Sequence, residues 1–293
     1  MESSQFSLVL PKKVVAQNHK KLHEVFGISK SSLYYKSKKY GEDLKVKEKI
    51  EQVWNDFPSY GHKRLSTALK LNKKRILRVM KKFSIKPYRR HKKPFKRSMV
   101  SVYDKYPNLL TTTPLTKINQ IWVTDFTYLW YKNRFIYVAT VIDIYNREVI
   151  GACILTNHSG ALVVQAVVSA LMNHRRPDII HSDQGSEYTS EIYTEFCNSS
   201  GIQISMSDKG SPWQNGYQES FYDKFKIDLG DPNRFESLGE LVFEIYRTIY
   251  VYNTNRIHTV LKMSPRELTK FTYILHSLTK WAQDENTIKI SRN

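Results

Sequence analysis

The sequence is poor in the residues and patterns that define several large classes of protein. It has only two cysteines, Cys153 and Cys197, so it needs no disulfide framework and has no paired spacing for a zinc module. No glycine-rich phosphate loop occurs, which argues against ATP-driven chemistry. No apolar run approaches the roughly 20 residues that cross a bilayer, and no signal-peptide pattern opens the chain. These absences predict a cytoplasmic protein.

Acidic residues are scarce in the first third of the chain. Residues 1–100 carry 27 Lys and Arg but only 7 Asp and Glu, whereas residues 101–293 carry 19 and 20. The whole net charge of +19 therefore belongs to the first third. Such asymmetry predicts an amino-terminal region that binds a polyanion, followed by a nearly neutral region that performs chemistry. The predicted partner is nucleic acid.

Helices are predicted in the basic third at 43–54, 62–71 and 73–83, from apolar residues at helical spacing. The last two are short and tightly joined, and the second is strongly basic, which is typical of a helix-turn-helix unit. Residues 86–97 lack periodicity and predict an extended basic linker along DNA. The predicted DNA contacts here are Lys73, Lys74, Arg75, Arg78, Arg89, Arg90, Lys92 and Lys93. Groove recognition, a general grip on phosphates and a merely solvated basic surface all stay open.

Three acidic residues stand in separate contexts that suit a shared site. Asp125 lies in a strand-like segment, 120–131, that is rich in aromatic and β-branched residues. Asp183 follows a short apolar run and is expected at the end of a strand, where α/β folds place ligands. Glu219 falls in the first turns of a predicted helix. Asp125 precedes Asp183 by 58 positions and Glu219 follows it by 36.

Carboxylates from two strands and a helix suit magnesium chemistry. Mg²⁺ prefers oxygen ligands and keeps places open for water and substrate phosphate. Two ions about 3.5–4 Å apart can activate an attacking oxygen and stabilise the leaving one, so no protein nucleophile is needed. Each acid alone could instead bond to backbone, cap a turn or face solvent. Only their joint occurrence favours a metal site.

The order of predicted elements after residue 115 indicates a mixed α/β domain with one sheet. Strands are predicted at 120–131, 135–144, 148–155, 179–181 and 202–206. Helices are predicted at 159–173, at 190–198 and around Glu219. The predicted domains are a basic helical region 1–84, a basic linker 85–114, a catalytic core 115–232 and a carboxyl-terminal helical extension 233–293.

Three motifs give the chain a family resemblance. They are W-x-x-D-x-T-Y at 122–128, HSD-x-G-x-x-Y at 181–188, and SMS-x-KG through NG-x-x-ESF at 205–221. In these motifs the chain resembles the DDE transposases of bacterial insertion sequences, and more distantly the retroviral integrases. Within that family it is similar to the second-frame product of elements with two overlapping reading frames, since no leucine heptad run is present.

The resemblance implies a ribonuclease-H-like core, a mixed five-stranded sheet flanked by helices, with Asp125, Asp183 and Glu219 as catalytic metal ligands. It implies two Mg²⁺ ions, with Mn²⁺ as a substitute, and cleavage at element ends followed by transfer of the 3′-hydroxyl into DNA. The implied partners are double-stranded terminal repeats and target DNA, further copies of the chain on paired ends, and a first-frame protein or fusion. The implied location is the bacterial nucleoid.

Two other functions fit parts of the sequence. A catalytically silent DNA-binding or accessory protein would keep the basic third without needing all three acids. A nuclease of the ribonuclease H type would cut without joining ends and would not need the basic region. Both stay as alternatives.

Several further residues have two possible roles. Lys226, two helical turns after Glu219, is expected to reach a DNA phosphate, the alternative being a helix-end cation. Lys209, in the loop before Glu219, could touch terminal nucleotides or simply belong to a plain loop. His181 is expected in the core, and Tyr128 and Tyr188 are expected to pack rather than to stack on bases. Arg256 and His258 follow the predicted catalytic core in the sequence, and they could either bind DNA or pack into the core.

Overall fold

The computed structural model describes residues 39–89, 106–208 and 211–290. The chain separates into two compact units, 1–48 and 49–293. The domain boundaries predicted from the sequence stay predictions. The predicted DNA contacts Arg90, Lys92, Lys93 and Lys209 lie outside the described residues.

Among the residues that the structure describes, three helices precede the sheet, within a few residues of the predicted ranges. They are α3 (Lys39–Asp56), α4 (His62–Leu69) and α5 (Lys73–Lys82). The turn between α4 and α5 is short because Lys70 adopts a left-handed conformation, φ 52°, and ends the first helix. Asn72 then caps the second helix, its side chain accepting a hydrogen bond from the Lys74 backbone N–H. The tight join predicted from the sequence is therefore present.

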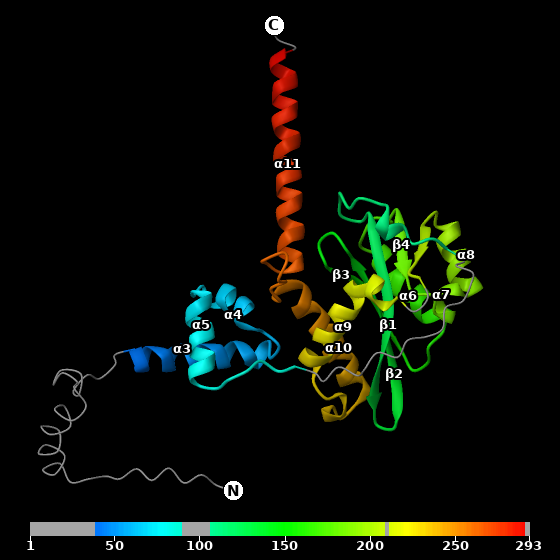
Figure 1. Cartoon of the computed structure of the whole chain (residues 1–293). Helices are drawn as coiled ribbons and strands as arrows, with labels where there is room; N and C mark the ends of the chain where they lie inside the picture. Colours follow the sequence, from blue (N-terminus) through cyan, green and yellow to red (C-terminus); the bar gives the residue numbers. More distant parts are fainter. Residues whose placement is uncertain (1–38, 90–105, 209–210, 291–293) are drawn as a thin grey trace, which may run out of the picture. The chain divides into compact units, whose positions relative to one another are not determined.

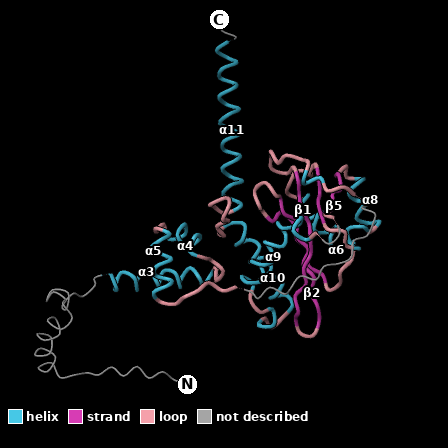
Figure 2. Tube along the Cα trace, in the orientation of Figure 1, coloured by secondary structure: helices cyan, strands magenta, loops and turns pink. Residues whose placement is uncertain are grey.

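One mixed five-stranded sheet forms the centre of the larger unit (Figure 2). Its strands are β1 (Ile121–Tyr131), β2 (Arg134–Asp143), β3 (Val149–Leu155), β4 (Ile179–Ser182) and β5 (Gln203–Met206). They lie in the order β3-β2-β1-β4-β5. The first three form an antiparallel meander, and β4 and β5 run parallel to β1. This is the mixed sheet predicted from the sequence.

Helices cover both faces of the sheet (Figure 1). On one face lie α6 (Gly160–Leu171), α7 (Ser186–Thr189) and α8 (Glu191–Ser199), and on the other α9 (Gly216–Leu229) and α10 (Leu238–Thr254). Three 3₁₀ turns, η1 (Leu109–Thr111), η2 (Pro212–Asn215) and η3 (Pro232–Arg234), lie in the connections, and α11 (Pro265–Ile290) follows α10. Two apolar cores result, one on each side of the sheet.

The alternation of side chains along β1 divides the strand between these cores. Ile121, Val123 and Leu129 pack in the core under α9 and α10, while Trp122 packs in the core under α6. Because successive residues of a strand point to opposite faces, Asp125 belongs to the α9 side. Pairing of β1 with β4 ends at Val123, so the β1–β2 hairpin continues beyond its neighbour.

The fold class predicted from the sequence is confirmed, with basic helices before a sheet flanked by helices. The extension predicted over 233–293 is helical where the structure describes it, although the separate bounds of α10 and α11 were not predicted. The four-residue α7 was not predicted either. Of the described helices, none combines the length and apolar character that crossing a bilayer requires.

Close packing of α6 on β3 requires glycine at position 151. A methyl group there would lie 2.8 Å from Ala170 Cβ and 2.9 Å from Ala170 N. We expect Gly151→Ala to lower the free energy of unfolding by roughly 1–3 kcal/mol, the usual cost of overpacking a core, measured by urea denaturation. Gly41→Ala is the control, since a methyl at Gly41 meets nothing within 4 Å. Equal stability of both variants would contradict this packing.

Candidate active site

Hydrogen bonds from α9 to the sheet begin at Gln218, which is fully buried. Its amide nitrogen donates to the carbonyl oxygens of Val123 at 2.8 Å and Thr140 at 3.1 Å. Its amide oxygen accepts from the Thr140 hydroxyl at 3.0 Å. Thr140 is the partner of Asp125 in the β1–β2 register. One buried amide therefore joins the start of α9 to the strand pair that carries Asp125.

A second contact lies one helical turn further along α9. The Tyr222 hydroxyl lies 2.7 Å from the carbonyl oxygen of Asp125 and 2.9 Å from the Thr140 hydroxyl. Residues three or four apart share a helix face, so Gln218 and Tyr222 fix both the position and the rotation of this turn. Glu219, which lies between them and is exposed, is held on the same turn. The helix acid is thus placed relative to the strand acid by buried polar contacts.

Parallel pairing brings Asp183 to the level of Asp125. The last pair between β1 and β4 joins Val123 to His181, and each acid lies two residues beyond its member of that pair. The Asp183 carboxylate accepts a hydrogen bond from the Gly185 N–H at 2.9 Å, which closes the turn after β4. The sheet register therefore sets the position of Asp183 relative to Asp125, just as the bonds from α9 to the sheet set the position of Glu219.

The turn after Asp183 is crowded with oxygen atoms. A methyl group at Gly185 would lie 3.0 Å from Asp183 Oδ1 and 3.2 Å from Glu187 Oε2. Glu187 in turn lies 2.5 Å from His158 Nδ1 and accepts a hydrogen bond from the Ser186 hydroxyl at 3.0 Å. Position 185 has little room for a side chain, because it adjoins two carboxylates.

The three acids are electrostatically coupled at Asp125. Burial raises the pKa of Asp125 to about 8, helped by the negative charges of Asp183 and Glu219 and opposed by the Phe126 N–H and the charge of Lys226. The pKa of Asp183 is also raised, first by the loss of water around it and then by the charge of Glu187. The charges of Asp183 and Glu219 disfavour the ionisation of Asp125, and a divalent cation would offset that repulsion.

The donor set suits a hard cation in its chemistry. It offers only carboxylate oxygens, which Mg²⁺ prefers, and the raised pKa of Asp125 reports an unmet need for positive charge. Among the residues described, however, no three His, Cys, Asp or Glu side chains are already arranged as a metal cage. The acids neighbour one another without converging on a single point.

Other residues named from the sequence have clear positions. His181 is buried and lies 2.8 Å from the Ser205 hydroxyl, and burial lowers its pKa to about 4, so it is a neutral core histidine as expected. Tyr188 is buried, as expected. Tyr128 is 57% exposed and packs edge-on against Phe135, so the expectation that it packs rather than stacks on bases stays a prediction. Nothing in the sequence motif separates these two tyrosines.

Lys226 faces the acids from α9. Its ammonium group lies 5.3 Å from the centre of the Tyr128 ring, and its charge lowers the pKa of Asp125. The cation is therefore close to the candidate site, although its contact with DNA stays a prediction.

Arg256 belongs to the interior rather than to a DNA surface. It is 2% exposed, forms an ion pair with Asp228 of α9 and donates to the Ser59 hydroxyl at 2.7 Å. The adjacent Ile257 N–H donates to the Tyr60 hydroxyl at 2.7 Å. These polar contacts fasten the chain after α10 to the last turn of α9, and they resolve the role that the sequence left open.

Sequence reasoning missed the residues that hold the site together. Gln218 directly precedes Glu219 in the third motif and Tyr222 directly follows the end of that motif, and this closeness to Glu219 was the available signal. Thr140 carried no signal, because it is an ordinary threonine in a β-rich segment.

Comparison with known proteins identifies the family. Residues 116–212 and 200–265 match two families that are both described as "Integrase core domain". The chain is 33% identical over 248 residues to the transposase for insertion sequence element IS904 of Lactococcus lactis, covering 80% of this chain and 97% of that protein. The chain belongs to the integrase-core transposases of bacterial insertion sequences.

Other insertion-element proteins match over similar lengths. A 31 kDa protein of insertion element IS600 from Shigella sonnei is 30% identical, with 81% of this chain and 93% of the relative covered. The putative transposase InsK of IS150 from Escherichia coli is 29% identical, with 84% and 92% covered.

Retroviral integrases are similar in structure at low sequence identity. The HTLV-2 integrase catalytic core domain in complex with magnesium is 19% identical, with a TM-score of 0.39, covering 51% of this transposase and 95% of the integrase. The simian T-cell lymphotropic virus intasome is 16% identical, with a TM-score of 0.45 and coverage of 74% and 73%.

We expect Gln218→Leu to reduce both stability and strand transfer. The change removes the amide donor to the buried carbonyl oxygens of Val123 and Thr140, which costs on the order of 2–4 kcal/mol in unfolding free energy. It also frees the turn that carries Glu219, so we expect strand transfer to fall at least about tenfold. Urea denaturation and a joining assay measure the two effects. Gln52→Leu, at an exposed position of α3, is the matched control, and unchanged stability of Gln218→Leu would refute this account.

The pKa of His258 predicts a loss of stability in mild acid. Burial, and then the nearby charges of Arg147, Arg64 and Arg256, lower this pKa to about 4. The unfolded chain therefore takes up the proton first, so stability is complete above pH 6.5 and falls as the pH drops from 6.5 toward 4, by at most about 1.4 kcal/mol per pH unit. Urea denaturation between pH 7 and pH 4.5 should show a smaller decline for His258→Gln. An identical decline in both proteins would rule this out.

Proposed function

We propose that the chain is a DDE transposase, a metal-dependent polynucleotidyl transferase that uses Asp125, Asp183 and Glu219 to cut and join DNA. The observation that carries the proposal is the coupling of these acids, since the charges of Asp183 and Glu219 both raise the pKa of Asp125. The family match supports it, as does the position of Asp125 on β1 and of Asp183 just after the adjacent parallel strand β4. Clustered acids with perturbed pKa values are typical of catalytic sites.

Under this proposal the three acids hold divalent metal. Asp125, Asp183 and Glu219 would together hold two such ions. Bound Mg²⁺, or Mn²⁺ in its place, would supply an activated attacking oxygen and charge stabilisation for the leaving oxygen. Gln218 and Tyr222 keep the Glu219 turn in place during the reaction, and Lys226 binds a phosphate beside the acids.

The reaction has two steps at the same acids. In the first, water attacks a phosphodiester at the end of the element, the bond from phosphorus to the 3′-oxygen breaks, and a 3′-hydroxyl is freed. In the second, that hydroxyl attacks another phosphodiester, so one P–O bond forms as another breaks. For the two-frame group, a circular intermediate is the expected product. No protein nucleophile is consumed, which agrees with a site composed of acids.

The substrate under this proposal is double-stranded DNA held by the basic region. On α5 the apolar side chains Ile76, Val79 and Met80 are buried, which turns the charged residues outward. The exposed cations of this helix are Lys73, Lys74, Arg78, Lys81 and Lys82. Backbone phosphates would supply affinity through this surface, and choice of sequence would need base contacts or a first-frame partner. Copies of the chain would act together on paired ends at the nucleoid.

Replacing any one acid should abolish strand transfer and leave DNA binding nearly intact. The variants are Asp125→Asn, Asp183→Asn and Glu219→Gln, assayed with terminal-repeat DNA and Mg²⁺ or Mn²⁺ for joined products and by mobility shift for binding. Glu191→Gln, at an exposed position in the first turn of α8, is the control and should join normally. Chelation of the metal should stop the wild-type reaction.

The same assay separates the two alternatives. Cut products without joined products would indicate a nuclease, and a shift without either would indicate a silent DNA-binding protein. Joining by any of the three acid variants would overturn the assignment of the site.

A further inference from the structure

Three large aromatic side chains lie together on the surface of the β1–β2 hairpin. Tyr128, Trp130 and Phe135 are 57%, 49% and 42% exposed. Phe135 is the register partner of Trp130. The ring of Phe135 lies edge-on to both others, with centres 5.2 Å from Tyr128 and 4.8 Å from Trp130. We call this group of three the aromatic platform.

The platform is exposed because the hairpin extends past the rest of the sheet. Pairing of β4 with β1 ends at Val123, so the later residues of β1 have no strand neighbour on that side. Exposing several large rings together sacrifices burial free energy, and apolar groups gathered at a surface often mark a binding site. The exposure of these three rings therefore indicates a binding site.

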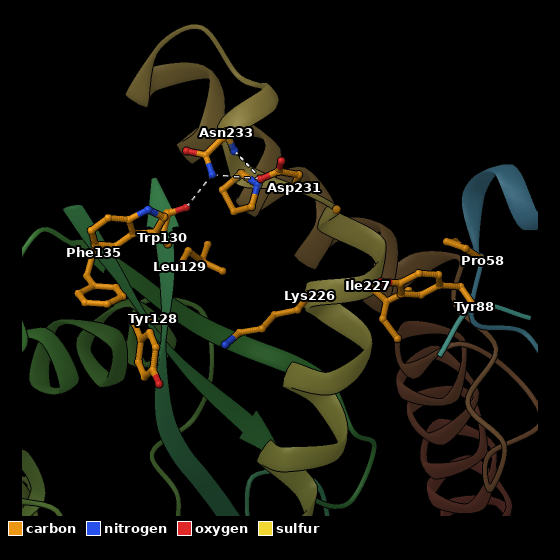
Figure 3. Close-up of a pocket in the computed structure, with 12 residues that line it drawn as sticks. Pro58, Tyr88, Tyr128, Leu129, Trp130, Phe135, Lys226, Ile227, Asp231 and Asn233 are labelled. Atoms are coloured by element: carbon orange, nitrogen blue, oxygen red, sulfur yellow. Dashed lines mark hydrogen bonds between the residues drawn. The ribbon is translucent and has the colours of Figure 1, made fainter. Parts of the chain in front are cut away.

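The hairpin that carries the platform is held firmly from the side of η3. Asn233 donates to the Trp130 carbonyl oxygen at 3.3 Å and accepts from the Lys132 N–H at 3.0 Å. The Tyr131 hydroxyl donates to the Phe235 carbonyl oxygen at 3.3 Å. Figure 3 shows Asn233 reaching the strand beside Trp130. A surface fixed in this way is preorganised for binding.

A positive charge adjoins the platform. Lys226 extends from α9 toward Tyr128 (Figure 3), with its ammonium group 5.3 Å from the ring centre. The same charge is felt by Asp125. A cavity of about 770 Å³ is lined by Tyr128, Trp130, Phe135 and Lys226 among others. The rings are not coplanar, but each exposed ring offers a flat apolar face, and such a face next to a cation matches a nucleotide, which has a flat base and an anionic phosphate.

We propose that the aromatic platform binds unpaired nucleobases of the DNA strand next to the phosphate that reacts, while Lys226 holds the phosphate of the same stretch. This inference deepens the proposed function and rests on it. In duplex DNA both faces of every interior base are covered by its neighbours, so the unpaired bases of a frayed or single-stranded end offer these rings much more free surface than a blunt end does. The platform thus selects opened ends beside the acids. A second copy of the chain is a less suitable occupant, because Lys226 complements an anion.

Binding of an opened end can be measured without catalysis. The full-length protein, with EDTA present, is titrated against two fluorescent duplexes of one sequence, one blunt and one with a three-nucleotide single-stranded end containing 2-aminopurine. Fluorescence anisotropy reports affinity, and the 2-aminopurine signal reports stacking. We expect the wild type to prefer the opened duplex and to change the 2-aminopurine fluorescence.

Tyr128→Ala and Trp130→Ala should remove that preference. Stacking contributes about 1–3 kcal/mol per base, so each variant should bind the opened duplex roughly 5- to 150-fold more weakly and the blunt duplex unchanged. Tyr128→Phe and Trp130→Phe keep an aromatic ring and should behave nearly as the wild type. Phe243→Ala is the matched control, because Phe243 is 69% exposed on α10.

Two results would contradict base stacking on the aromatic platform. One is an alanine variant that is as stable as the wild type in urea and still prefers the opened duplex. Another is an alanine variant that binds the opened duplex normally but changes the oligomeric state in sedimentation velocity, since the surface would then join two copies of the chain. The binding measurement does not depend on catalysis. If the chain binds opened ends through these rings but cannot join DNA, the proposed function is wrong and the proposed role of the platform still holds.

Discussion

The candidate site depends on the buried hydrogen bonds between α9 and the β1–β2 pair. Gln218 and Tyr222 bond to oxygen atoms of Val123, Asp125 and Thr140, in surroundings where an unmet polar group is costly. Helix and strands can therefore associate in only one register. Since Glu219 lies between the two bonding residues, its position relative to Asp125 follows from bonds that involve neither carboxylate.

The same arrangement places like charges where they destabilise one another. A carboxyl group with a pKa near 8 is mostly protonated at neutral pH until a cation or a change of conformation stabilises its charge. A site of this kind lowers the stability of the metal-free fold, and the well-packed cores on both faces of the sheet offset that loss. At Asp125, the features that favour metal binding therefore also lower the stability of the metal-free fold.

Most of the fold could be predicted from local patterns, and most of the support for the site could not. Aromatic and β-branched residues predict strands such as the one at 120–131, and the spacing of Ile76, Val79 and Met80 predicts α5. The roles of Gln218 and Thr140 depend on partners far away in the sequence. The exposure of Tyr128 depends on where β4 stops pairing, which the sequence of β1 does not reveal.

One helix carries both an acid of the site and the cation beside it. Glu219 and Lys226 are seven residues apart on α9, or roughly 10 Å along the axis at 1.5 Å per residue. Because the helix is rigid between them, the spacing of these two residues along α9 is fixed by backbone geometry. Inserting a single residue there would rotate the ammonium group about 100° around the helix axis and change its position relative to Glu219.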